Sequence, residues 1–367
     1  MARFMELALY DSESGYYARA ARRSGRAGDF FTSVDVGAVF GELLARQVIE
    51  MAGLVQSPVS SLQSSVASRQ SPVDFVEAAA GNGRLSADIL RAIRAQDRAT
   101  YDSLRLHLVE LSAAARHAQR PTLDDVADRL TSSTPDLPPA FTGVLIANEL
   151  LDAMPVHQVV MREDGLREVY VTADHSDPRL ETGDWRLMTI EGPPSTPALE
   201  EYLNRADVKL EAGWRAEINL NAVEWVRDAV RRLERGFLIL IDYGHPAREL
   251  YSVTHAGGTL TTFSRHTNSD SWLARPGEQD ITAHVDFTSV SRAAEDAGGD
   301  ILALLDQTYF LLGLGAAELD AADLKTRLAV KTLLMPGGLG STLKVLIVGK
   351  NVGRPALRGC SFGVRLT

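Results

Sequence analysis

The sequence predicts an α/β protein built on an open, mostly parallel β-sheet. The first observation is a pair of continuously apolar runs, Val144–Ala147 and Phe237–Ile241, which are typical of central parallel strands buried on both faces. The second is that stretches with apolar residues at helical spacing alternate with such runs. The third is a β-type run from Phe75 that leads into two glycines and then into a helical pattern, which indicates a strand–turn–helix unit.

The predicted elements follow in a regular order after Phe75. A helix is expected after the glycines, because apolar residues recur at helical spacing from Leu85 to Ile93. A second helix is expected over 221–235, and the next strand is expected to begin at Gly236. The runs that predict further strands are Leu106–Glu110, Val144–Ala147, Val156–Val160, Glu168–Val171, Phe237–Ile241 and Lys344–Val348.

The chain divides into four predicted parts. Residues 1–53 form an N-terminal helical cap segment, with a helical stretch at Val39–Met51. Residues 54–74 are rich in Ser, Gln and Pro, which favours a flexible surface linker. The sheet domain is expected over 75–350, and residues 351–367 form a C-terminal tail.

Two insertions interrupt the predicted sheet domain, at about 155–215 and 244–300. Both follow the carboxyl ends of strands, where an open α/β sheet binds its ligand. We therefore interpret them as lids or substrate-recognition segments. Oligomerisation elements or decoration are the alternative.

The composition is that of an ordinary globular protein. The chain has 367 residues, 45% hydrophobic and 23% charged, and a net charge of -10. Such a negative field disfavours nucleic acids and anionic membranes and suits a cationic target. A single cysteine, Cys360, excludes a disulfide framework and a cysteine metal cluster within one chain. No apolar run reaches 18 residues and the first residues lack a secretory signal, so we expect a cytoplasmic protein without membrane insertion. A homodimer is left open.

The glycine turn has the spacing E-x-A-x-G-x-G, formed by Glu77, Ala79, Gly81 and Gly83. A dinucleotide loop reads G-x-G-x-x-G and holds a pyrophosphate. S-adenosylmethionine (AdoMet) has no phosphate, and it needs the close backbone approach more than an anion site. The spacing thus favours AdoMet, with a plain tight turn as the alternative. Glu110 ends the next predicted strand 27 residues after Gly83, where an acid can bond a ribose diol.

Asn148 and Glu149 follow the buried run at Val144–Ala147, so both are expected at the carboxyl tip of a strand. Their oxygens can accept hydrogen bonds from a nitrogen nucleophile, and a carboxylate pairs with a guanidinium in a bidentate fashion. Methyl transfer requires mainly that the nucleophile is oriented and that charge is stabilised. The alternative is that Glu149 and Asp152 cap a helix that starts here.

Two further groups of polar residues are candidates. Thr32, Ser33 and Asp35 can close over a ligand or, as we favour from the residues alone, cap the following helix. Asp242 and Tyr243 follow the run at Phe237–Ile241 and point toward the same crevice.

Histidines within the second predicted insertion are candidates for acid–base catalysis or for metal binding. His245 follows the strand tip, and histidine is a residue type that serves as a general base near neutral pH. Asp280, His284 and Asp286 invite a metal site, but no third ligand is indicated on the face that His284 and Asp286 share, so no metal is expected. The basic residues of 19–26 have no interleaved aromatics, which favours a solvated loop over a nucleic-acid site.

The chain resembles the MidA-type methyltransferases, the family of the mitochondrial complex I assembly methyltransferase. The motifs that carry this resemblance run in order from Phe4 to about Lys350: FMELALYDSESGYY, GDFFTSVDVGAVFGELLA, VEAAAGNGRLSADILRAI, HLVELS, LIANELLDAMPVHQ, LIDYGHP, PGEQDITAHVDF and LMPGGLGSTLKVLIVGK. The resemblance implies a Rossmann-like class I AdoMet-dependent methyltransferase fold, AdoMet as cofactor and methylation of arginine in a protein partner.

The resemblance also implies the residues of the site. Those that would bind the cofactor are Asp29, Thr32, Ser33, Glu77, Ala79, Gly81, Gly83, Glu110 and Asn148. Those that would act in catalysis or line the rim are Asn148, Glu149, Asp242, Tyr243 and His284.

The chain departs from the family pattern at three places. Ala79 stands where the family usually has Gly, so we expect a negative φ there and weaker cofactor binding. The family's TSPE reads Thr32-Ser33-Val34-Asp35 here, which removes a rigid proline and shortens the acid. A helix common upstream of the first motif in relatives is missing, which a misassigned start codon would explain.

Three other functions stay open on the sequence. A small-molecule O- or N-methyltransferase would enclose its substrate under the insertions. A non-catalytic assembly factor would keep the fold without the chemistry, and Ala79 motivates that alternative. A dehydrogenase is less favoured, because no G-x-G-x-x-G follows a strand.

Overall fold

The structure is a computed structural model that describes residues 1–19, 32–57, 71–174, 186–264, 267–269, 272–319, 323–335 and 339–362. It divides into two compact units. The sheet unit comprises Phe31–Leu150, Val226–Tyr243 and Ser291–Thr367. The insert unit comprises Met1–Phe30, Leu151–Trp225 and Gly244–Val290.

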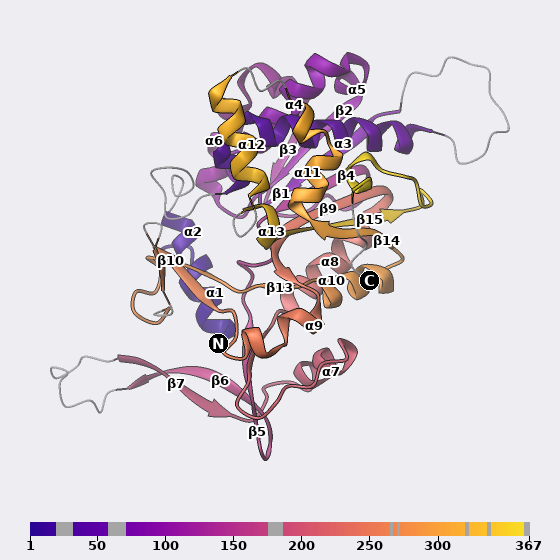
Figure 1. The fold of residues 1–367 in the computed structure, drawn as a ribbon. Helices are drawn as coiled ribbons and strands as arrows, with labels where there is room; N and C mark the ends of the chain where they lie inside the picture. Colours follow the sequence, from indigo (N-terminus) through magenta and orange to yellow (C-terminus); the bar gives the residue numbers. More distant parts are fainter. Residues whose placement is uncertain are drawn as a thin grey trace. The chain divides into compact units, whose positions relative to one another are not determined.

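The sheet unit is built on seven strands in the order β14-β15-β9-β4-β1-β2-β3, and β13 pairs with the end of β9 that belongs to the insert unit (Figure 1). The strands are β1 (Val73–Ala78), β2 (Leu104–Val109), β3 (Leu130–Thr134), β4 (Phe141–Asn148), β9 (Leu233–His245), β13 (Val285–Asp286), β14 (Asp300–Asp306) and β15 (Leu343–Lys350). Neighbours from β3 to β9 are parallel, and β15 runs antiparallel to both β9 and β14. This arrangement confirms the predicted mostly parallel sheet.

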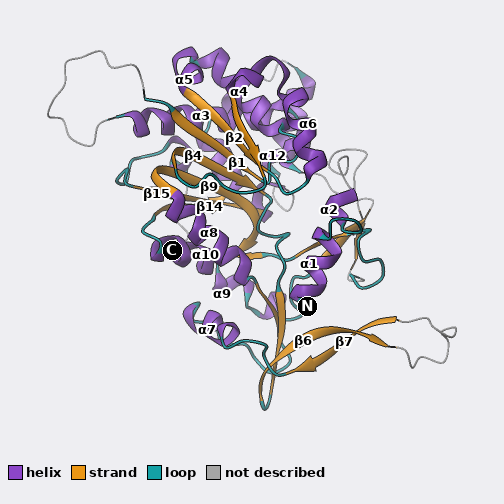
Figure 2. Ribbon diagram, turned by 180° about the vertical axis from the view of Figure 1, so that it is seen from behind, coloured by secondary structure: helices purple, strands orange, loops and turns teal. Residues whose placement is uncertain are grey.

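Helices cover the sheet, as Figure 2 shows for α3, α4 and α5. The helices with residues in the sheet unit are α3 (Ala38–Gln56), α4 (Arg84–Gln96), α5 (Arg98–Ser103), α6 (Ala113–Leu123), α8 (Leu220–Arg232), α10 (Phe287–Asp296), α11 (Gln307–Gly313), α12 (Leu324–Leu334) and α13 (Leu339–Thr342), with the 3₁₀ turns η1 (Ser33–Val36), η2 (Asp124–Arg129), η4 (Ala316–Glu318) and η5 (Arg358–Cys360). Side chains of α3, α4, α11 and α12 form one buried core with alternate residues of the central strands. Burial of this apolar surface is the main force that holds the sheet and these helices together.

The insert unit contains two antiparallel sheets, one with the order β7-β6-β5-β8 and one with β11-β10-β12. Its remaining strands are β5 (His157–Arg162), β6 (Gly165–Asp174), β7 (Arg186–Gly192), β8 (Arg215–Ile218), β10 (Thr261–Ser264), β11 (Thr267–Ser269) and β12 (Asp280–Thr282). Its helices are α1 (Ala2–Tyr10), α2 (Tyr16–Arg19), α7 (Ala198–Arg205) and α9 (Ala247–Leu250), with the turn η3 (Val253–His255). The unit has two buried apolar clusters of its own.

The predicted elements of the core are confirmed, with two corrections. The strand predicted to begin at Gly236 begins at Leu233, because pairing with β4 starts at Phe141 opposite Leu233. The Lys344–Val348 strand exists as β15 but runs antiparallel to its neighbours. Neither pairing partner nor strand direction can be read from an apolar run.

The observed division differs from the predicted one at the N-terminus and the linker. Residues 1–53 do not act as one segment, because α1 lies in the insert unit while α3 packs in the core of the sheet unit. The predicted linker, 54–74, overlaps the last turn of α3 and the start of β1, and residues 58–70 lie outside the described residues. The second predicted insertion ran to 300, but the insert unit ends at Val290. Among the described helices, none has both the length and the apolar character of a membrane span.

Candidate functional site

The glycine turn follows β1 at the carboxyl edge of the sheet. Ala79, Gly81 and Gly83 all have positive φ, at 55°, 49° and 82°. A Cβ at Gly83 would lie 3.2 Å from the Leu108 side chain, so the turn packs closely against β2. A Cβ built at Gly81 meets nothing within 4 Å, so the backbone faces open space there. The turn therefore leaves open space beside its backbone at Gly81, and the contact of these residues with a cofactor stays a prediction.

The expected negative φ at Ala79 is wrong. The residue is left-handed, which the turn requires, and its exposed methyl group makes the conformation tolerable. An L-residue pays about 1–2 kcal/mol for this conformation, and glycine does not. We therefore expect Ala79→Gly to raise the free energy of unfolding by about 1 kcal/mol, after the entropy that glycine loses on folding.

Urea denaturation of the full chain measures this effect. The matched control is Ala80→Gly, because Ala80 is adjacent, buried and not left-handed. That variant should lose about 1 kcal/mol of stability. Equal destabilisation by both variants would contradict the strain at Ala79.

Glu110 holds the glycine turn in place. Its Oε2 accepts a hydrogen bond from the Gly81 N–H at 2.9 Å, and its Oε1 accepts one from the Ser112 N–H at 2.8 Å. Gln119 of α6 donates from Nε2 to the Gly81 carbonyl at 2.9 Å. The predicted ribose ligand thus lies beside the turn that it orients. Gln119 was missed, because nothing in its sequence context distinguishes it from any helix-surface glutamine.

Glu77 lies beneath the turn, with 5% of its surface exposed. Its Oε2 accepts hydrogen bonds from the Ser86 N–H, at 3.1 Å, and from the Ser86 hydroxyl. Burial, opposed by these bonds, raises the pKa of Glu77 to about 8. Glu77 was predicted to bind the cofactor, and the structure shows it linking β1 to the first turn of α4.

Asn148 and Glu149 lie at the carboxyl tip of β4, as predicted, next to the glycine turn because β4 pairs in parallel with β1 up to Ala78 opposite Ala147. Asn148 Nδ2 donates to Glu149 Oε1 at 3.1 Å. Asn148 Oδ1 is buried and has no hydrogen-bond partner, which is costly for a polar atom. A buried acceptor atom without a partner in the protein indicates a place where a ligand donates a hydrogen bond.

Glu149 has a left-handed backbone, with φ at 53°, which is a strained conformation of the kind found at functional sites. Burial raises the pKa of Glu149 to about 8, and the nearby Asp242 adds to this, while hydrogen bonds from Asn148 and from the Ser33 N–H oppose it. Asp35 also repels the charged form. The Glu149 carboxyl group thus lies near two other carboxyl groups, those of Asp242 and Asp35.

Asp242 fixes the strained turn. It is 1% exposed, its Oδ2 accepts from the Leu150 N–H at 3.0 Å, and its Oδ1 accepts from the Tyr243 N–H at 2.9 Å. The Glu149 N–H donates to the Ile241 carbonyl at 2.8 Å, so two bonds from β9 hold the chain on either side of the Glu149 side chain. Asp242 therefore positions the Glu149 turn, and its predicted part in catalysis stays a prediction. Tyr243 packs against the apolar core, and its predicted part in catalysis stays a prediction.

The segment after residue 31 reaches this site. Thr32 and Asp35 form a capping box around η1, with Asp35 Oδ2 accepting from the Thr32 N–H at 3.1 Å, which confirms the capping interpretation. Asp35 Oδ1 lies 3.2 Å from Arg84 Nη1 at the start of α4, and the Ser33 N–H bonds to Glu149. The capped turn therefore connects the glycine turn to the β4 tip. Asp29, also predicted to bind the cofactor, lies outside the described residues.

Two predicted residues beyond β4, Asp152 and His284, lie in the insert unit. No helix begins after Glu149, because residues 149–155, all of them described, form turns. Asp152 therefore caps no helix; it belongs to the insert unit. His284 also belongs to the insert unit, where its ring lies 5.4 Å from that of His245, and its place at the catalytic rim stays a prediction.

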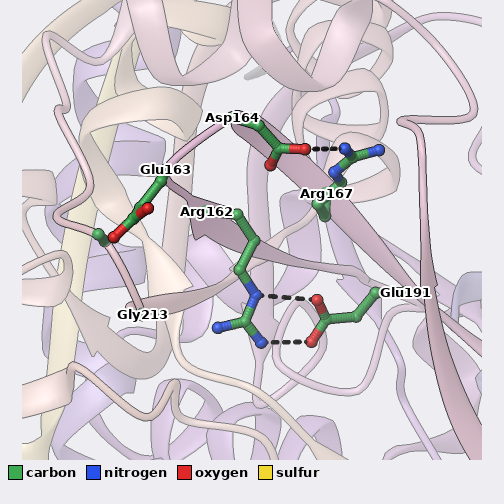
Figure 3. Close-up of a pocket in the computed structure, with 7 residues that line it drawn as sticks. Arg162, Glu163, Asp164, Arg167, Glu191 and Gly213 are labelled. Atoms are coloured by element: carbon green, nitrogen blue, oxygen red, sulfur yellow. Dashed lines mark hydrogen bonds and ion pairs between the residues drawn. The ribbon is translucent and has the colours of Figure 1, made fainter.

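The insert unit has a surface hollow beside the β5–β6 turn (Figure 3). Arg162 makes a bidentate ion pair with Glu191, with N–O distances of 2.9 and 2.6 Å, and Arg167 pairs with Asp164. These charges neutralise each other across an open surface. The hollow offers no set of unpaired groups aimed at a ligand, so we do not assign it a function.

The residues at the β1 and β4 tips fit AdoMet. The open backbone face at Gly81 leaves room for a ligand that approaches closely. The buried Asn148 Oδ1 needs a hydrogen-bond donor, and AdoMet carries donors in its amino groups and ribose hydroxyls. Glu110 borders the same turn with a carboxylate. The residues that would hold the cofactor are therefore the glycine turn, Glu110 and Asn148.

Comparisons with known proteins agree with this fit. Residues 43–304 match a family model described as "Putative S-adenosyl-L-methionine-dependent methyltransferase". The mitochondrial protein arginine methyltransferase NDUFAF7 of Rattus norvegicus is 29% identical over 343 residues, which cover 86% of this chain and 70% of that protein. The Drosophila melanogaster homolog of the same name is 27% identical over 81% of this chain and 67% of that protein. A crystal structure from Burkholderia thailandensis, bound to S-adenosyl-homocysteine, is 30% identical, with a TM-score of 0.84 over 99% of this chain and 90% of that chain.

Proposed function

We propose that this chain, which belongs to the family of S-adenosyl-L-methionine-dependent methyltransferases, methylates a guanidinium nitrogen of an arginine in a protein partner. The acceptor class is supported by the curated relatives, which are named protein arginine methyltransferases. It is also supported by the net charge of -10, which favours a cationic target.

The observation that carries the proposal is the position of Glu149 among acids, beside the open acceptor of Asn148. Asp242 and Asp35 both disfavour the charged form of Glu149. A cation placed against the carboxylate would relieve that repulsion and stabilise the anion. A guanidinium meets this need best, because it is always charged and its planar donors pair with a carboxylate in a bidentate fashion.

The residues have separate roles in this proposal. AdoMet, when bound, supplies a methyl group activated on a sulfonium. Glu149 binds the guanidinium, fixes its plane, and accepts a proton at its carboxylate, for which a pKa of about 8 suits it better than an ordinary glutamate. Asp242 keeps the Glu149 turn in position through the Leu150 N–H. Glu110 keeps the glycine turn in the shape that receives the cofactor.

A labelling experiment tests the acceptor class. The full chain is incubated with methyl-labelled AdoMet and size-fractionated cell extract, and products are identified by mass spectrometry. Methylarginine in protein supports the proposal. Label confined to small molecules would replace it with the small-molecule alternative. Cofactor binding without any labelled product, in extracts from several growth conditions, would favour the non-catalytic assembly factor.

Two further predictions, about the cellular location and the oligomeric state, belong to this proposal. We keep a cytoplasmic location and a homodimer as hypotheses, while the curated relatives are named mitochondrial. Cell fractionation and a solution mass measurement test them directly.

A further inference from the structure

We propose that the insert unit binds one Zn²⁺ ion through His245, His255 and His284. One ring nitrogen from each histidine lies within 4.8 Å of the others. The ring centroids are 5.0, 5.4 and 6.0 Å apart. The three histidines belong to the insert unit and the residues at the β1 and β4 tips to the sheet unit, and the inference does not rest on the methyltransferase proposal.

Three different segments bring the histidines together. His245 ends β9, His255 ends η3, and His284 lies between β12 and β13. Parallel pairing of Gly244 with Val285 sets His245 beside the segment that carries His284. The sequence prediction of no metal weighed His284 only with Asp280 and Asp286. It missed the cluster because His245 and His255 are far away along the chain.

The two aspartates once considered as ligands are engaged elsewhere. Asp280 Oδ1 accepts a hydrogen bond from the Tyr17 hydroxyl at 2.9 Å. Asp286 accepts hydrogen bonds from the Ser289 N–H and hydroxyl at the start of α10. The metal-binding capacity of this region therefore lies in the imidazoles.

The surroundings of the histidines resemble the outer shell of a metal site. The His255 Nδ1 lies 3.0 Å from the Glu249 carbonyl, and a donated bond there leaves Nε2 as the ligand atom. The Glu249 carboxylate lies 3.7 Å from His245 Nδ1, close enough to offset the charge of a bound ion. The His284 backbone N–H donates to Thr259 Oγ1 at 3.1 Å. The Thr259 N–H in turn donates to Glu217 at 2.7 Å, which anchors the segment.

Zn²⁺ is the ion that this set fits. Imidazole nitrogens bind it at about 2.0–2.1 Å, and three histidines with one open position form a known zinc geometry. Tetrahedral bonds of that length place ligand nitrogens about 3.4 Å apart, and the ring nitrogens lie within 4.8 Å of one another, so they have to converge by up to about 1.4 Å. Small side-chain rotations achieve that. The ion would tie together the end of β9, the η3 turn and the β12–β13 connection.

Metal titration of the chelator-treated, tag-free full chain at pH 7.5 tests the proposal. Metal ligands bind in their deprotonated form, which is why the titration is done above neutral pH. We expect one Zn²⁺ per chain by calorimetry and by elemental analysis after dialysis, and a higher melting temperature with Zn²⁺ present. Co²⁺ should give visible absorption bands of a four-coordinate nitrogen site.

Variants connect the ion to the histidines. His255→Gln and His284→Gln should each weaken Zn²⁺ binding by about 100-fold or more, because loss of a ligand exceeds the 10–100-fold effect of outer-shell changes. The matched control is His117→Gln, an exposed histidine of α6 in the sheet unit, which should leave binding unchanged. Melting of the metal-free forms shows that the variants fold. No stoichiometric ion in the unmodified chain, or equal affinity in the folded His255 and His284 variants, would overturn the site.

Discussion

Glu149→Gln is expected to reduce the rate of methyl transfer by about 100- to 10,000-fold, the range that a general base contributes, while AdoMet binds within about threefold of its original affinity. The amide keeps the size of the side chain, and its oxygen can still accept the Ser33 N–H. It has no negative charge to hold a guanidinium and cannot accept a proton. Single-turnover methylation of a labelled arginine substrate, together with AdoMet calorimetry, measures both effects.

The pH profile of the unmodified chain gives an independent signature of Glu149. Its pKa of about 8 means that the carboxyl is largely protonated and neutral below that pH, and anionic above it. The value of kcat/KM should therefore rise as pH increases through about 8 and fall toward neutral and acidic pH. Glu149→Gln should lose this step.

A matched control shows whether the effect belongs to this carboxylate. Glu163→Gln removes an exposed acid from the β5–β6 turn of the insert unit and should change neither rate nor pH profile.

Asp242→Asn should lower the rate with cofactor affinity preserved, because Asp242 positions the Glu149 turn. Full activity of Glu149→Gln would remove Glu149 from the mechanism.

The parts of the fold that the sequence predicted correctly are those that leave a local pattern of residue types along the chain. The strands β4 and β9 were found because burial on both faces leaves continuous apolar runs. The glycine turn was found because positive φ selects small residues at fixed spacing. The direction of β15 and the start of β9 depend on which strand each one pairs with, and no local pattern records a partner.

The contrast between local patterns and distant partners also explains which parts of the site were predicted and which were not. Asn148 and Glu149 were predicted at a strand tip, and the parallel register of β1 and β4 brings them to the glycine turn. The positioning role of Asp242 follows from a bond to Leu150, which is 92 residues away. The three histidines meet only because β9, η3 and β13 are neighbours in space. Side chains whose role depends on a distant partner look like ordinary surface residues in the sequence.

Glu110→Gln is expected to weaken the binding of AdoMet and S-adenosyl-homocysteine by about 10- to 100-fold, because a hydrogen bond to a charged group contributes about 1.5–3 kcal/mol. The carboxylate accepts from two backbone N–H groups, of Gly81 and of Ser112. An amide has only one acceptor oxygen, so one of these donors would face an NH₂ group. The glycine turn loses an anchor at the place where it meets the cofactor.

Calorimetry with both ligands measures this loss. The matched control is Glu234→Gln, an exposed acid at the other end of the sheet, near the start of β9, which should bind both ligands as the unmodified chain does. A comparison of melting temperatures separates lost contacts from a disordered turn. If Glu110→Gln kept its affinity for both ligands, neither the anchoring of the glycine turn by Glu110 nor a contact of Glu110 with the ribose would contribute to cofactor binding. An equal loss for AdoMet and S-adenosyl-homocysteine would show that Glu110 acts on a part that both ligands share, either directly or through the glycine turn, and not on the methyl group, which only AdoMet carries.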